Sequence, residues 1–202
     1  MSLEALFADF PKVRLENDPA VIFALDAGLR LIYVNPAWYR FAAENGVAAD
    51  ELTRKYFGQS IQLVIPGALR DFYAAVYRHV LKKRECVQHT YECSSADRYR
   101  LMHMRLLPLR GGAGILCVNS VVSEGPHTRD SSSSNDQAYL EDGLVNMCSS
   151  CRRTRRAQTE IWDWVPDYVD DPPFMVSYGL CPICHSYYRN IVEAAQIAGE
   201  SI

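Results

Sequence analysis

The chain lacks any run of the roughly 20 apolar residues that span a bilayer. Its longest apolar stretches are broken by Arg30, Asn35 or Asn119. It also has no basic excess, since its formal net charge is -3, so no overall positive field draws it onto nucleic acid or an anionic membrane. The first ten residues carry acids where a secretory signal carries Lys or Arg. We therefore expect a cytoplasmic chain without a membrane partner, in which any contact with nucleic acid is local.

The motifs of common catalytic sites are absent as well. The sequence has no P-loop, no dinucleotide-binding glycine motif and no nucleophile motif. Its one glycine run, at 111–114, lies between two expected strands, whereas a phosphate-binding loop precedes a helix. The run therefore predicts a hairpin turn, and we expect no enzymatic activity.

What is present is a composition that supports a globular core. Of the 202 residues, 49% are hydrophobic and 22% are charged. After Val122 the composition changes abruptly to a polar stretch with four consecutive serines, which buries too little apolar surface to order itself. These shifts predict four parts of the chain: an N-terminal extension at 1–17, a first domain at 18–122, a disordered Ser-rich linker at 123–138 and a smaller module at 139–202.

Local patterns in the first domain predict an α+β fold. Residues 21–25 and 29–34 form two short strands around a turn, and Asn35 followed by Pro36 is a good helix start. Apolar residues repeat at helical spacing over 68–83. Three more strands are expected, at 86–93, 99–109 and 114–122. We therefore expect a five-stranded antiparallel sheet with helices on one face.

This order of elements resembles the PAS domain. The run from Asp18 to Asp26 and the segment Val34-Asn35-Pro36-Ala37-Trp38 are similar to the family's opening hairpin and the start of its first helix. Gly58–Ile61, the long helix and the closing strands follow in the family's order. The resemblance implies a PAS-like fold and a sensory role. It also implies either a small ligand between sheet and helices or a homodimer through the outer sheet face.

Strand alternation and the helical stripe predict which side chains border such a pocket. The expected lining is Phe72, Tyr73, Val76, Val87, His89, Tyr91, Met102 and Met104. His79 and His89 are the histidines that could bind haem, but an isolated histidine near a core usually completes a hydrogen bond. In the haem-binding members of the family that this sequence resembles, the ligand lies earlier on the long helix, where this sequence has Tyr73, and that departure weakens the haem reading. A haem-based gas or redox sensor is therefore an alternative, not the main interpretation.

The strongest chemical signal is a pair of CxxC motifs, Cys148 with Cys151 and Cys181 with Cys184. Each tight turn presents two thiolates, and two such turns complete the tetrahedral set that structural Zn²⁺ prefers. The sequence therefore predicts a zinc-ribbon-like module with a structural ion. We also expect three aromatic residues between the pairs to pack around the metal: Trp162, Trp164 and Tyr168.

Two other readings of these cysteines are weaker: c-type haem attachment, and a thioredoxin-like dithiol, which needs a βαβ context around its CxxC motif that is absent here. The motif that ends in His185 matches c-type haem attachment, but that chemistry belongs to exported chains. Cys86, Cys93 and Cys117 lie in expected strands, where cysteine is commonly a small packing residue. The tail from Met147 to Cys184 resembles a short module appended to bacterial PAS proteins and response regulators.

Four arginines beside the first CxxC motif could bind phosphate, nucleic acid or an acidic partner: Arg152, Arg153, Arg155 and Arg156. Acidic residues downstream balance their charge, which favours a protein partner or a solvated turn. We therefore predict a non-catalytic signal sensor or adaptor that detects a small ligand or partner and docks onto a signalling protein through its zinc module. A transcription regulator that binds DNA through the arginines is the alternative.

Overall fold

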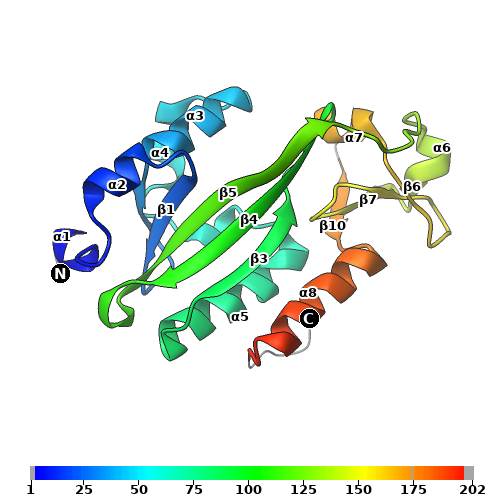
Figure 1. Cartoon of the computed structure of the whole chain (residues 1–202). Coiled ribbons are helices and arrows are strands. Elements are labelled where there is room, and N and C mark those ends of the chain that lie inside the picture. The colour runs from blue at the N-terminus through cyan, green and yellow to red at the C-terminus, as the bar shows by residue number, and fades with distance from the viewer. Residues whose placement is uncertain (1–2, 174, 198–202) are drawn as a thin grey trace.

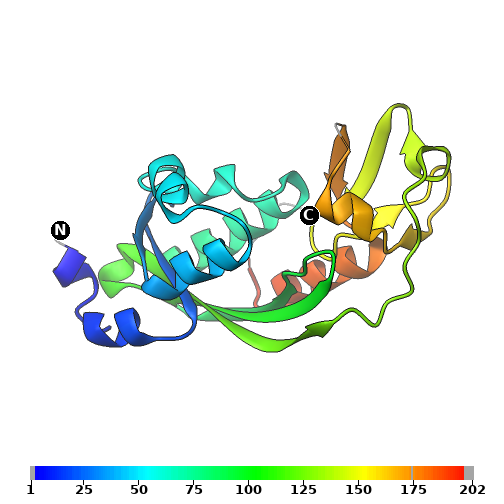
Figure 2. The same cartoon turned by 90° about the horizontal axis from the view of Figure 1, so that it is seen from above.

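The computed structural model describes residues 3–173 and 175–197, in which a larger N-terminal part lies beside a smaller C-terminal one (Figures 1 and 2). Five strands form the sheet of the first part: β1 (Val21–Asp26), β2 (Leu31–Val34), β3 (Val87–Glu92), β4 (Arg98–Pro108) and β5 (Gly114–Pro126). Their order is β2-β1-β5-β4-β3, and every pairing is antiparallel. The predicted α+β fold class is therefore confirmed.

Helices connect β2 to β3 across one face of this sheet (Figure 2). They are α3 (Pro36–Glu44), α4 (Ala49–Tyr56), the 3-10 turn η1 (Ile61–Leu63) and α5 (Gly67–Lys83). Two short helices, α1 (Leu3–Leu6) and α2 (Lys12–Asn17), precede the sheet. Leu6, Phe7 and Leu15 from this segment pack in one cluster with Ile22 and Tyr33 of the sheet. The N-terminal extension thus covers part of the opposite face.

Asn35 explains why the hairpin leads directly into α3. Its side-chain Oδ1 accepts hydrogen bonds from Ile22 N at 3.0 Å and Trp38 N at 3.1 Å, and its Nδ2 donates to Ala20 O at 2.9 Å. The residue is fully buried. One amide therefore caps the helix and holds it against β1.

Helix α5 supplies much of the core. The predicted stripe of Leu69, Phe72, Tyr73, Val76 and Val80 is buried in full. The helix ends where Arg84 takes a left-handed conformation with φ 59° and its N–H donates to Val80 O. These side chains pack against the sheet in the largest hydrophobic cluster.

The C-terminal part is a small mixed sheet with three helices. Its elements are α6 (Asp136–Tyr139), β6 (Leu140–Glu141), β7 (Leu144–Cys148), β8 (Thr154–Arg155), β9 (Trp162–Asp163), α7 (Pro166–Asp170), β10 (Val176–Gly179) and α8 (Pro182–Ala194). The strand order is β10-β7-β8-β9, β6 also pairs with β7, and β10 runs parallel to β7. Tyr139, Val145, Met147, Val165 and Tyr168 form a separate core.

The predicted linker boundaries are wrong, because β5 continues to Pro126, past the expected end at Val122. The residues that follow make defined contacts and do not form a disordered spacer. The Arg129 side chain donates to Glu92 and lies 5.1 Å from the ring of Trp164, and the ring of His127 is 4.3 Å from the same indole. The segment therefore fastens the C-terminal part to the end of the sheet.

The two parts also share a core, which the division at 123–138 did not predict. Helix α8 lies beside α5 and β3 (Figure 1). The ring of Tyr188 packs 4.7 Å from that of Phe72, and the Tyr187 hydroxyl donates to Thr90 O at 2.8 Å. Ile197 is buried in the same cluster. No helix in the described part of the chain is long and apolar enough to cross a membrane.

Candidate functional site: a four-cysteine cluster beside an interdomain pocket

Each CxxC motif sits where a strand or loop turns sharply. Cys148 ends β7, and the chain turns back through Arg152, whose φ is 61° and whose N–H donates to Cys148 O at 3.0 Å. Cys181 precedes α8 as its N-cap residue, with Pro182 at the first helical position. Cys184 therefore lies in the first turn of α8. The helix dipole places partial positive charge there, which favours thiolates.

Strand pairing brings the two motifs together. In the parallel pairing of β7 with β10, Gly179 lies opposite Cys148, and Ser149 N donates to Gly179 O at 2.8 Å. As a result, the four Sγ atoms of Cys148, Cys151, Cys181 and Cys184 all lie within 4.8 Å of one another. The structure thus assembles the predicted set of four cysteines.

The geometry of the cluster fits a tetrahedral metal ion. All seven cysteines are free thiols, so no disulfide joins the cluster. A zinc–sulfur bond of about 2.3 Å gives a tetrahedral edge of about 3.8 Å. The Sγ atoms of Cys151 and Cys181 are 3.8 Å apart. The cluster can therefore hold an ion in a closed, four-sulfur site.

The thiols influence each other's protonation. Hydrogen bonds from Cys151, Cys181 and Cys184 lower the pKa of Cys148, while the hydrogen bond with Cys148 raises the pKa of Cys151. The Cys181 backbone N–H also donates to Cys148 Sγ at 3.4 Å, which stabilises a thiolate there. A dication that binds four thiolates releases the protons that these sulfurs otherwise share.

The aromatic residues between the two motifs do not all surround the cluster. Trp162 packs against the cysteines together with Leu180. Trp164 instead contacts His127 and Arg129, and Tyr168 belongs to the separate core of the module. The expectation for Trp164 and Tyr168 is therefore wrong, because their side chains anchor the incoming segment and α7.

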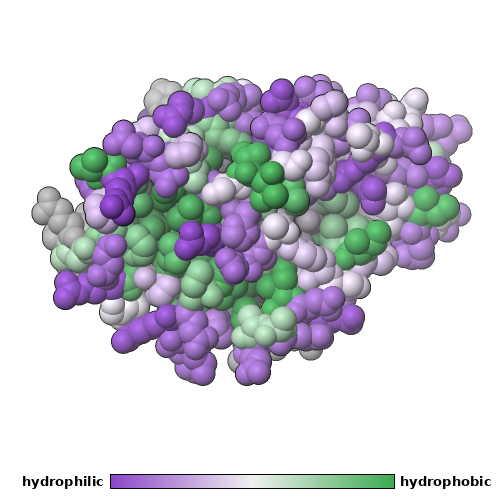
Figure 3. Space-filling model, viewed as in Figure 1, coloured by the Kyte–Doolittle hydropathy of each residue, from purple (hydrophilic) through white to green (hydrophobic). Residues whose placement is uncertain are grey.

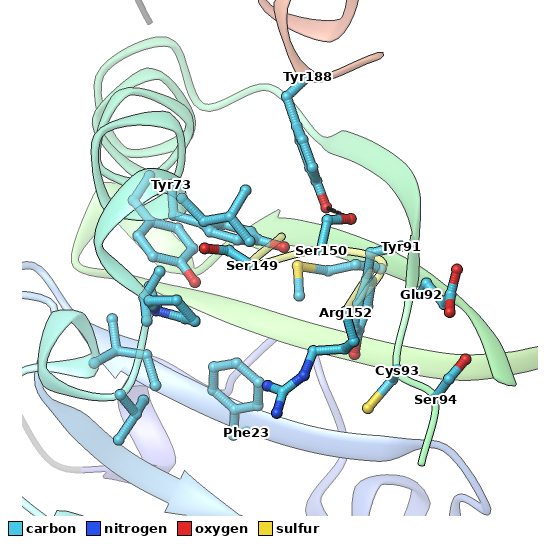
Figure 4. Close-up of a pocket in the computed structure, with 17 residues that line it drawn as sticks. Phe23, Tyr73, Tyr91, Glu92, Cys93, Ser94, Ser149, Ser150, Arg152 and Tyr188 are labelled. Carbon is cyan, nitrogen blue, oxygen red and sulfur yellow. Dashed lines mark hydrogen bonds between the residues drawn. The ribbon is translucent and has the colours of Figure 1, made fainter. Parts of the chain in front are cut away.

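A pocket with a volume of about 370 Å³ lies between the first part and the four-cysteine module (Figure 4). The first part contributes Phe23, Ile61, Val64, Ile65, Pro66, Leu69, Tyr73, Tyr77, Tyr91, Glu92, Cys93, Ser94 and Met104, and the module contributes Ser149, Ser150, Arg152 and Tyr188. This volume is within the range of small-molecule pockets. The cavity therefore opens where the two parts meet, at the end of the hollow between sheet and helices.

The pocket contains some of the side chains that strand alternation and the helical stripe predicted, but not all of them. Tyr73, Tyr91 and Met104 line the cavity. Phe72, Val76, Val87, His89 and Met102 are buried in packed regions outside it. On α5, the row of Leu69, Tyr73 and Tyr77 borders the cavity, while the adjacent row of Phe72 and Val76 contacts other side chains. The pattern predicts burial, and it does not distinguish these two rows.

His89 is a packing residue in this arrangement. Its ring lies 5.6 Å from that of Phe72 and 5.8 Å from that of Tyr73, and its Nδ1 is 3.0 Å from Thr90 O. Burial lowers the pKa of His89 below its usual value of 6.5. Its Nε2 has no hydrogen-bond partner among the described residues.

The arginine cluster divides into different environments. The Arg155 guanidinium pairs with Glu141, and Arg156 pairs with Asp163 at 2.8 Å. Arg152 instead extends from the module into the pocket (Figure 4). Arg153 is half-buried and does not line the pocket. The four side chains therefore do not form one continuous basic surface.

The module's contribution to the pocket was missed at the sequence level. The turn of the first CxxC motif contains Ser149 and Ser150, and Arg152 follows it directly. Nothing in the spacing of these residues indicates a cavity. A signal for Tyr188 is present, because Cys184, Tyr188, Ile191 and Ala195 repeat at helical spacing, and this stripe packs on the large cluster. This stripe is longer than a zinc-binding turn requires, so it could have indicated that the helix packs on the first part of the chain.

The five-stranded antiparallel sheet, its helical cover and a cavity at the end of their hollow define an α+β domain. Residues 15–124 match the family described as PAS fold, which is more than half of the chain. The chain therefore belongs to the PAS family, whose domains serve as sensors in signalling proteins. No curated protein matches the chain in sequence.

Several solved structures are similar to this part of the chain. The PAS domain of BvgS from Bordetella pertussis is 20% identical, covers 57% of this chain and 86% of its own, and gives a TM-score of 0.43. A domain of a sensory box sensor histidine kinase/response regulator from Geobacter sulfurreducens is 18% identical over 55% and 91%, with a TM-score of 0.39. The PAS domain of nitrogen regulation protein NR(II) from Vibrio parahaemolyticus is 13% identical over 56% and 98%, with a TM-score of 0.32.

Proposed function

We propose that the chain is a non-catalytic signalling sensor. Its PAS domain responds to a small ligand, and its C-terminal module is a structural zinc site that interacts with a partner protein. The observation that carries this proposal is the pocket shared between the two parts, which Tyr73 and Met104 line from one side and Ser149 and Arg152 from the other. A molecule in this pocket contacts both parts at once.

Such a pocket provides a direct route from ligand to module. A ligand shifts a conformational equilibrium only by its difference in affinity for the two states. Tyr188 of α8 links the first CxxC turn to the core, because its hydroxyl contacts that of Ser150 at 3.1 Å. Movement of α8 away from α5 therefore separates Ser149 and Arg152 from the PAS side of the pocket. A bound ligand therefore favours the docked state, and its loss makes the module easier to release.

The chemistry of the donor set supports zinc. Four thiolates suit a soft or borderline ion such as Zn²⁺, and hard ions such as Mg²⁺ or Ca²⁺ prefer oxygen. When bound, the ion supplies structural cross-linking between β7 and α8. Four sulfur ligands leave no open coordination position, so the site is proposed to be structural and not catalytic.

Elemental analysis of the full chain tests this assignment. We expect one zinc ion per chain in protein prepared without chelator, and its loss in Cys151→Ser and in Cys184→Ser. Cys86→Ser is the matched control, because Cys86 is exposed and lies outside the cluster. A zinc-free wild-type protein that keeps the fold of its module contradicts the proposal, as does full zinc retention in both cluster variants.

The alternatives gain less support from the geometry. Binding of DNA normally requires a wide basic face, but the carboxylates of Glu141 and Asp163 pair with two of the arginines. Haem ligation by His89 requires access from a cavity, but His89 lies outside the pocket. The outer face of the sheet has apolar groups between polar ones (Figure 3). A homodimer through this face is compatible with the sensor.

A further inference from the structure

The pocket has a mainly apolar wall from the PAS domain and a mainly polar wall from the module. The PAS domain contributes Leu69, Tyr73 and Met104, whereas the module contributes two serines and Arg152. Burial raises the pKa of Tyr73 well above its usual value, so its hydroxyl stays neutral. A molecule that fills this cavity therefore meets an apolar wall opposite a single cation.

Two polar groups at the module's side of the pocket have unused hydrogen-bonding capacity. Ser149 is 8% exposed, and its Oγ has no hydrogen-bond partner among the described residues. The Nε of Arg152 is likewise buried without a partner. No salt bridge joins Arg152 to a carboxylate in the part of the chain that the structure describes. Buried donors without partners cost free energy, so a ligand that satisfies them gains binding energy.

Among the other polar groups that line the pocket, the hydroxyls of Ser150 and Ser94 are engaged, and Glu92 is engaged through one of its two oxygens. The Ser150 hydroxyl contacts that of Tyr188, and the Ser94 Oγ accepts from Arg100 N at 3.1 Å. The Glu92 carboxylate, also at the wall, is held by Arg129 through one oxygen, which offsets its charge, while Oε1 has no partner. The positive charge available to a ligand is therefore that of Arg152.

We propose that this pocket binds a small organic acid with an apolar body. Its carboxylate contacts the Arg152 guanidinium and the Ser149 hydroxyl, and its apolar body lies against Leu69, Tyr73 and Met104. One guanidinium with one free hydroxyl matches a singly charged carboxylate, whereas phosphate sites gather several donors. This inference rests on the proposed function, because it assumes that the shared pocket is the sensory site.

Arg152 also has a second possible role, since it follows the ligand Cys151 directly and could offset the negative charge of a four-thiolate site. Its guanidinium lies 5.9 Å from the ring of Tyr178, a position that serves either role. The two roles predict different results. A residue of the metal centre changes zinc retention when it is replaced, whereas a residue of the ligand site changes only the preference for acids.

The test compares an acid with its neutral amide on the zinc-loaded full chain. Isothermal titration with 3-phenylpropionate and 3-phenylpropionamide, extended to hexanoate and hexanamide, measures the preference for the carboxylate. We expect the wild-type chain to bind at least one acid about 10- to 100-fold more tightly than its amide, as a charge-assisted hydrogen bond provides. Arg152→Ala should remove this preference, and Ser149→Ala should reduce it by about three- to tenfold.

Arg153→Ala is the matched control, because the neighbouring arginine does not line the pocket, and it should keep the wild-type preference. The proposal is overturned if neither acid binds, if acid and amide bind equally well, or if the preference survives Arg152→Ala. Zinc loss in both Arg152→Ala and Arg152→Gln also overturns it, because the guanidinium then serves the metal. Zinc content of the wild-type chain tests the proposed function separately, so the two failures are distinguishable.

Discussion

Replacement of Tyr188 tests whether the PAS domain and the module form one cooperative unit. The side chain is 1% exposed, and its ring packs against Phe72 of α5. Truncation of a buried aromatic residue to alanine costs about 3–5 kcal/mol. The hydroxyl contact with Ser150 accounts for about 1 kcal/mol of this, by the usual value of a hydrogen bond. We therefore expect Tyr188→Ala to lower the unfolding free energy by about 3–5 kcal/mol and Tyr188→Phe by about 1 kcal/mol.

Urea unfolding of the zinc-loaded chain measures both the cost and the cooperativity. In a Trp38→Phe background, Trp162 and Trp164 report on the module by fluorescence, while far-UV circular dichroism reports on both parts. With Tyr188 in place the two transitions should coincide, and in Tyr188→Ala the fluorescence transition should come first, because the module has lost its anchor. Asn190→Ala is the control on the exposed side of α8 and should change stability by less than about 0.5 kcal/mol. A cost below about 1 kcal/mol with coincident transitions in Tyr188→Ala would refute the shared core.

Two further predictions concern the PAS domain alone. Asn35→Ala should cost about 2–4 kcal/mol in urea unfolding, because it removes the cap of α3 and leaves the buried Ile22 N–H unpaired; a cost under 1 kcal/mol contradicts this. Burial lowers the pKa of His89, so the folded chain keeps this ring neutral while the unfolded chain binds a proton below about pH 6.5. Stability should therefore fall as the pH drops from 7.5 to 5.5, and His89→Gln should reduce that fall; identical pH dependence in both proteins contradicts the assignment.

Local patterns predict most of the PAS domain because its elements follow from residues close in sequence. The alternation on the strands, the Asn35-Pro36 helix start and the stripe on α5 each act within a few residues. The four cysteines are also predictable, since each CxxC turn is local and the chemistry of thiolates allows few other uses. These features required no knowledge of which distant segments meet.

The linker and the pocket depend on distant contacts, and there the sequence is insufficient. The serine-rich composition of 131–134 indicates disorder, but Ser132 N donates to Trp164 O at 2.8 Å and the Ser134 hydroxyl donates to Asp167 at 2.9 Å. Hydrogen bonds of this kind replace the apolar burial that the segment lacks. No local pattern predicts them, because the partners lie more than 30 residues further along the chain.

The same distant contacts join the predictions into one physical argument. Ser149 and Arg152 face Leu69 and Tyr73 only while the module is docked, and Tyr188 contributes a fully buried side chain to that docking. A ligand that contacts both sides of the pocket binds the docked state more tightly than the released state. It must therefore stabilise the docked state by the same free energy that docking adds to its binding. Because this linkage is reciprocal, a variant that weakens docking but leaves Ser149 and Arg152 unchanged must also weaken acid binding. Tight acid binding in a chain with a released module would place the carboxylate contact somewhere other than Arg152.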